Sequence, residues 1–106
     1  FVKFTEKEYS NVFRYPKENV GNLYEIKGDI NQVIGNQEDG YNLFIKTKNT
    51  ACWVVVKFNP GFNFVYWDNV TLYCKTLGIV HYENSSNARN SAVLMELLPN
   101  TPIIIK

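Results

Sequence analysis

The stretch "YPKENVGNLYEIKGDINQV", residues 15–33, places a glycine inside a segment that otherwise alternates like a β-strand. Between Asn22 and Ile34 one side of the predicted strand carries mainly apolar residues, and the other carries charged or polar residues. Gly28 falls on the apolar side, where a glycine lowers strand stability by about 0.5–1 kcal/mol. Glycine suits this position if the strand bends there, because a residue without Cβ lets a sheet curl tightly.

The same alternation predicts four further strands, each bounded by turn residues. They cover 41–47, 51–58, 68–82 and 92–98, and Asp39-Gly40 supplies the hairpin turn before the first of them. Five strands joined by tight turns and one longer connection predict a small closed or nearly closed β-barrel. The first strand must then pair with two neighbours and bend at Gly28. We expect Gly78 to serve the fourth strand in the same way.

A short helix is expected before the first strand. Thr5 and Glu8 have the spacing of a capping box, and Pro16 ends the pattern. The apolar face of this helix would consist of Tyr9, Val12 and Phe13. The predicted organisation is thus a single domain, 1–106, with a helical segment at 1–16, the barrel at 22–98 and a tail at 99–106.

Composition limits the function classes. The chain has 106 residues, which is enough for one core, and its formal net charge of +1 provides no strong field for phosphates or acidic lipids. No apolar run approaches the roughly 20 residues of a membrane helix. The chain begins at Phe1 without an initiator methionine or a signal-peptide pattern, so we expect an excised domain or a processed product.

Three runs carry a further pattern: "EKEYSNVFRYPKENVGNLYEIKGDINQVI", "DNVTLYCKTLGIVHYE" and "SAVLMELLP". Their shared motifs are a lead at Tyr15-Pro16, a glycine at Gly21, a first-strand core at Ile26 and Gly28, and a fourth-strand start at Asp68, Val70 and Leu72. With these motifs the chain resembles an OB-fold domain of Gram-positive exported proteins and lipoproteins, in the wider tRNA-anticodon-binding-like OB group. The resemblance implies an all-β, five-stranded Greek-key barrel, export, and no known catalysis.

The residues that could support catalysis lie too far apart. Cys74 and His81 are about 23 Å apart along one strand, and Glu25 and Asp29 about 13 Å apart along another. Two cysteines and one histidine cannot make a tetrahedral zinc site. Strand parity points both Cys52 and Cys74 at the core, where they are either free thiols or a disulfide. We therefore expect no enzyme, no metal and no cofactor.

Aromatic and basic residues gather on the outer faces of the second and third predicted strands. The candidate ligand-binding residues are Phe44, Lys46, Trp53 and Lys57, extended by Tyr82 and Arg89. Bases could stack on the two aromatic rings, with the lysines on phosphates. Alternatively, the N-terminal helix or the aromatic loop at 62–67 covers these rings and forms a second small core. We favour the covered arrangement, because the net charge is nearly balanced and the N-terminal segment needs a surface to pack on.

Three functions fit these observations. The first is a non-catalytic interaction module of a larger Gram-positive cell-envelope or mobile-element protein, which binds a protein partner and is extracellular or envelope-associated. The second is a single-stranded nucleic-acid-binding domain that uses the outer face of strands two and three, with a cytoplasmic location. The third is a spacer domain without a ligand. We expect a protein partner in preference to nucleic acid, and oligomeric state is left open.

Overall fold

The computed structural model describes residues 1–36, 40–47, 53–58, 63–83 and 89–106. These residues are mostly β-structure with one short helix, as predicted. In chain order the elements are β1 (Val2–Lys3), α1 (Glu6–Arg14), β2 (Leu23–Asn36), β3 (Gly40–Thr47), β4 (Trp53–Phe58), β5 (Asn69–Glu83), β6 (Arg89–Leu97) and β7 (Ile104–Ile105). Among the described residues, no helix has the length and apolar character needed to span a membrane.

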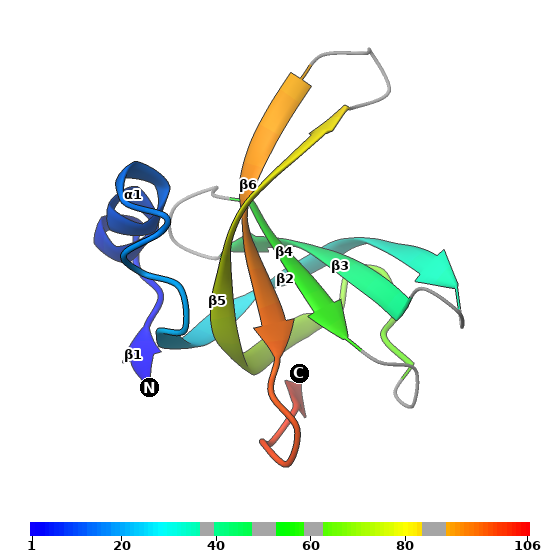
Figure 1. The fold of residues 1–106 in the computed structure, drawn as a ribbon. Helices are drawn as coiled ribbons and strands as arrows, with labels where there is room; N and C mark the ends of the chain where they lie inside the picture. The colour runs from blue at the N-terminus through cyan, green and yellow to red at the C-terminus, as the bar shows by residue number, and fades with distance from the viewer. Residues whose placement is uncertain (37–39, 48–52, 59–62, 84–88) are drawn as a thin grey trace.

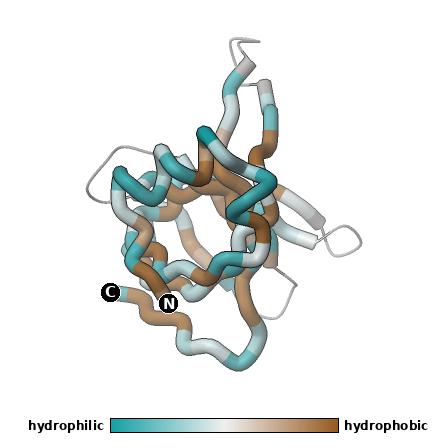
Figure 2. The backbone as a smooth tube through the Cα atoms, turned by 60° about the vertical axis from the view of Figure 1, so that its left-hand side comes forward, coloured by the Kyte–Doolittle hydropathy of each residue, from teal (hydrophilic) through white to brown (hydrophobic). Residues whose placement is uncertain are grey.

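Five strands close into a ring in the order β2, β3, β4, β6, β5 and back to β2 (Figure 1). Every pairing around the ring is antiparallel except that of β4 with β6, which is parallel. Hydrophobic stretches recur along the strands around the ring (Figure 2). The five predicted strands are these five and differ only at their ends. The largest difference is β6, which starts at Arg89 because residues 89–91 pair with the end of β5.

Gly28 lies where β2 passes from one neighbour to the other, as the sequence predicted. It is opposite Thr47 of β3 on one side and Val70 of β5 on the other. A Cβ at this position would lie 2.4 Å from the Lys46 carbonyl oxygen and 2.6 Å from the Ile45 Cγ2. The glycine is therefore required by the close approach of β3.

Gly78 serves β5 for a different reason. β5 pairs with β2 through Lys75 and with β6 from Cys74 onward, and the β6 register shifts between Thr76 and Gly78. Gly78 has a φ of 131°, a value that L side chains rarely adopt, although a Cβ there would meet no atom within 4 Å. Here the backbone conformation, and not the space, requires glycine.

The interior of the ring is filled by the apolar side chains that the alternation assigned to it. They belong to one cluster, whose fully buried members include Ile26, Ile30, Leu43, Ile45, Val54, Val56, Leu72, Cys74, Val93 and Met95. Burial of a side chain of this size contributes about 1.5–3 kcal/mol. Phe64, in the segment before β5, packs against this cluster and meets the Phe58 ring edge-on at 5.0 Å.

The helix also contributes to this core, but its details differ from the prediction. α1 follows Thr5 and buries Val12 completely, while Phe13 remains 37% exposed. The Thr5 side chain makes no capping hydrogen bond, so the predicted capping box is wrong. The turn is held by the backbone, where the Tyr9 N–H donates to the Thr5 carbonyl at 2.9 Å.

Two short edge strands were not predicted. β1 pairs in parallel with Tyr24 and Glu25 of β2, and β7 pairs with Val70 and Thr71 of β5. Part of the expected tail at 99–106 is therefore β-structure. Asp39 of the predicted hairpin turn lies outside the described residues, and Gly40, with a φ of 81°, opens β3.

The substitution Gly28→Ala tests how the ring closes. The added methyl group must push β3 away from β2, so we expect the free energy of unfolding to fall by about 1–3 kcal/mol. Lys27→Ala, at the exposed residue just before Gly28, should change the free energy of unfolding by less than about 0.5 kcal/mol. Urea titrations of both variants measure this difference, and a Gly28→Ala protein as stable as the parent would contradict it.

Candidate functional site

The outer face of β3 presents the side chains that strand parity assigned to it. Leu43 and Ile45 point into the core and are fully buried, whereas Phe44 between them is half-buried and Lys46 is exposed. Two of the six candidate residues are therefore accessible on the outside of the ring.

β4 lies beside β3 and adds two more candidates to the same face. Trp53 is the register partner of Lys46, and Lys57 is the partner of Asn42. Trp53 is half-buried and Lys57 is exposed. Cross-strand partners on one face have Cβ atoms about 4.5–5.5 Å apart, so Trp53 and Lys46 are neighbours.

Tyr82 joins this face from the far end of β5. Its ring meets the Phe44 ring edge-on, with centroids 5.3 Å apart and an interplanar angle of 74°. Such a pair contributes about 0.5–1.5 kcal/mol beyond its burial. We call Phe44, Lys46, Trp53, Lys57 and Tyr82 the outer-face site.

Within the described residues, Tyr82 covers part of the outer-face site, while Phe62 of the aromatic loop that the sequence suggested lies outside the described residues. Val55, the partner of Phe44, is only 3% exposed, and Ala92 of β6 is fully buried; neither belongs to the cluster inside the ring. The ring that meets Phe44 is Tyr82, whereas Phe64 of the aromatic loop packs against the core. Val55 and Ala92 are thus buried outside the main cluster, and Tyr82 is a described residue whose ring contacts Phe44.

The sixth candidate, Arg89, begins β6 opposite Glu83. Its side chain lies outside the described residues. The sequence placed it in a loop, whereas its backbone continues the ladder between β5 and β6.

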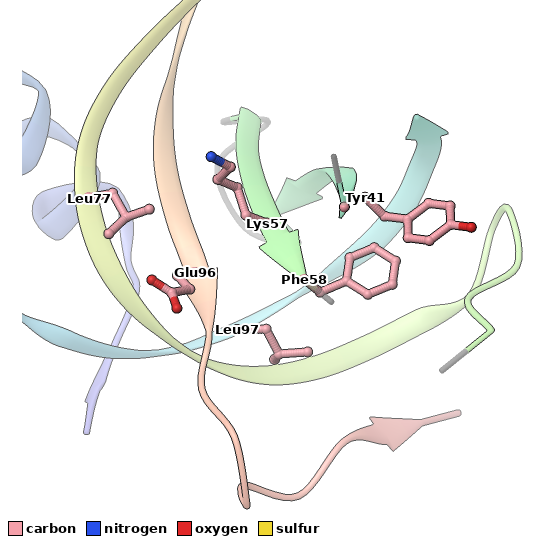
Figure 3. Close-up of a pocket in the computed structure, with 7 residues that line it drawn as sticks. Tyr41, Lys57, Phe58, Leu77, Glu96 and Leu97 are labelled. Atoms are coloured by element: carbon pink, nitrogen blue, oxygen red, sulfur yellow. The ribbon is translucent and has the colours of Figure 1, made fainter. Parts of the chain in front are cut away.

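A pocket of about 300 Å³ adjoins Lys57 (Figure 3). Its lining residues are Gly40, Tyr41, Lys57, Phe58, Leu77, Glu96 and Leu97. Figure 3 shows Glu96 and Leu77 on one side and the rings of Tyr41 and Phe58 on the other, and these rings stack with centroids 5.4 Å apart.

Lys57 and Glu96 give the pocket charges of both signs. They are register partners on the parallel strands β4 and β6, both are exposed, and no ion pair joins them. The sequence analysis missed Glu96. The available signal was the strand order of the expected Greek-key arrangement, because placing the fifth strand beside the third brings these two residues together.

The carboxylates considered for catalysis have structural partners. Glu25 lies 3.6 Å from the Lys27 ammonium and accepts a hydrogen bond of 3.3 Å from the Tyr73 hydroxyl. Asp29 accepts a hydrogen bond of 2.8 Å from Asn69. Partial burial, followed by the nearby Glu25 charge, raises the pKa of Tyr73 above its usual value.

Cys74 and His81 occupy unrelated environments. Cys74 is a free, fully buried thiol, while His81 is exposed and its Nδ1 lies 2.7 Å from the Ser91 hydroxyl. Cys52 lies outside the described residues. Within the parts of the chain that the structure describes, no group of three or more His, Cys, Asp or Glu residues is placed to hold a metal ion.

Burial raises the pKa of Cys74 from 9.0 to about 12, so the thiol should be inert in the folded protein. In a Cys52→Ser background we expect no reaction with a disulfide reagent at pH 8 until denaturant is added. Because the pKa is raised in the folded state, stability should also fall as pH rises from 9 towards 12. The raised pKa of Tyr73 should also lower the folding stability as the pH rises. The difference between the parent and Cys74→Ala therefore measures the contribution of the thiol alone. Rapid labelling without denaturant would contradict the assignment.

Comparison of the chain with protein families, curated proteins and solved structures found no match in any of the three. The site is therefore defined by its own geometry: two aromatic rings in edge-on contact, two exposed lysines, and a pocket lined by a lysine and a glutamate.

Proposed function

We propose that the chain is a non-catalytic OB-fold binding module of a larger Gram-positive cell-envelope or mobile-element protein. The order of the ring supports this, because an OB-fold is a five-stranded Greek-key barrel that binds ligands on its second and third strands. Those strands correspond to β3 and β4, which carry most of the outer-face site. The envelope location follows from the resemblance of the sequence motifs.

The favoured ligand is an extended segment of a partner protein. The observation that carries this choice is that Lys57 and Glu96 lie on neighbouring strands in the same register and line one pocket with the apolar Leu77 and Phe58. A glutamate in the pocket repels a phosphate backbone, whereas a polypeptide can offer a charge of each sign and an apolar side chain between them. The nearly balanced charge of the whole chain points the same way.

The second candidate function is binding of single-stranded nucleic acid. It is supported by Lys46, which is exposed and lies beside the half-buried Trp53. A ring next to a cation suits a stacked base with its phosphate. Lys46 lies beside Trp53 at the start of β4, whereas the pocket that contains Glu96 adjoins the end of that strand.

Peptides selected from a random display library against the wild-type chain test the first function. We expect the synthetic peptides to lose about tenfold in affinity on Lys57→Ala or Glu96→Ala, or about 1.4 kcal/mol, because each variant removes one charge of the pocket. Lys17→Ala, an exposed lysine before β2, is the matched control and should bind normally. Peptides whose affinity ignores both pocket variants would show that the partner lies elsewhere.

A titration with a fluorescent single-stranded oligonucleotide at low salt separates the two functions. We expect no saturable binding, because no described cluster of cations offers several phosphate contacts. Saturable binding that weakens steeply as salt rises, and that Lys46→Ala reduces, would instead support the nucleic-acid function.

A further inference from the structure

Three charged side chains form a row across neighbouring strands on the outside of the ring. Glu96 of β6 has Lys57 of β4 as its register partner on one side and Lys75 of β5 on the other. Register partners point to the same face of a sheet, and neighbouring strands lie about 4.8 Å apart. The order of charges is therefore positive, negative, positive over a span of about 10 Å. We call Lys57, Glu96 and Lys75 the charge row.

The charge row ends on uncharged residues at both sides. Beyond Lys57 the next register partner is Asn42 of β3. Beyond Lys75 the next register partner is Leu23 of β2, whose side chain is 42% exposed. A ligand that lies across these strands thus meets three charges in a defined order.

The charges of the row are available to a ligand. Lys57 and Glu96 are exposed, and Lys75 is half-buried. No ion pair joins Glu96 to either lysine. Figure 3 shows the Lys57 and Glu96 side chains pointing in different directions. Because the three charges do not contact one another, each can form an ion pair with a partner.

Apolar surface borders the charge row at the pocket. Leu77 of β5 lines the pocket on the side of Glu96, and the stacked rings of Tyr41 and Phe58 lie opposite (Figure 3). A partner bound over this surface displaces water from around the row. Ion pairs that form there are stronger than ion pairs in open water, because the local dielectric constant is lower.

We infer that the partner segment carries an acidic, a basic and an acidic residue in that order and lies across β4, β6 and β5. This inference rests on the proposed function, in which the pocket binds a polypeptide. The two carboxylates of the segment pair with Lys57 and Lys75, and its basic side chain pairs with Glu96. A segment with three acidic residues would place a carboxylate against Glu96, and a basic segment would meet both lysines.

The span of the charge row limits the length of the motif. An extended chain advances about 3.3 Å per residue, so about four residues cover the row. The three charged residues of the segment should therefore fall within about five consecutive positions. The order of charges reads the same in both directions, so the segment can run either way across the strands.

Lys75 distinguishes this inference from the proposed function, because it belongs neither to the pocket nor to the outer-face site. Peptides selected against the wild-type chain should bind Lys75→Ala about tenfold more weakly. Lys75→Arg keeps the charge and should bind like the parent. Lys27→Ala, an exposed lysine on β2 away from the row, is the matched control. Peptides that depend on Lys57 and Glu96 but not on Lys75 would overturn the inference and leave the proposed function in place.

A charge exchange tests the order of charges. Glu96→Lys makes the row entirely positive, so a library selected against this variant should yield peptides with an acidic central residue. In a peptide selected against the wild-type chain, replacing the central basic residue by glutamate should weaken binding to the wild type about tenfold and strengthen binding to Glu96→Lys by a similar factor. Urea titration verifies that each variant is folded.

Two results of this exchange contradict the inference in different ways. If the central charge of the peptide has the same effect on the wild type and on Glu96→Lys, the inference fails while the peptide site stands. If the library yields no peptide for the wild-type chain, the proposed function fails together with the inference.

Discussion

The close approach of β2 and β3 at residue 28 is the constraint on which the structure depends. One strand must serve two neighbours, and the sheet can close only if β3 comes nearer than a Cβ would allow. Once the ring is closed, the parity of every strand is fixed, because a one-residue shift would turn each core residue outward. The inner face then becomes a continuous core, and the outer face becomes the surface available to ligands.

The outer surface is shaped by a second consequence of closure. β5 pairs with β2 only through Lys75, and its end continues with β6 as a two-stranded arm, which brings Tyr82 onto Phe44. The parallel contact of β4 and β6 places Lys57 beside Glu96. Neither pair is near in sequence, so both exist only because the ring closes in this order.

Alternation predicted the five long strands, their buried faces and the bend at Gly28, because burial on one side leaves a period of two in the residues themselves. It could not predict β1 and β7, which contain two residues each and are selected by an available edge. The capping box at Thr5 failed because spacing alone does not determine where a hydroxyl points. The contact of Tyr82 with Phe44 was not predicted, because the alternation of residues along β5 does not show where the end of that strand lies relative to β3.

β2 determines where the outer-face site lies, although it contributes no residue to that site. Its first half closes the ring with β5, while its second half pairs with β3, which carries Phe44 and Lys46. A change that separates β2 from β3 at Gly28 would therefore move Phe44 and Lys46 together with the core side chains of β3. The core and the outer-face site thus depend on the same close approach of two strands.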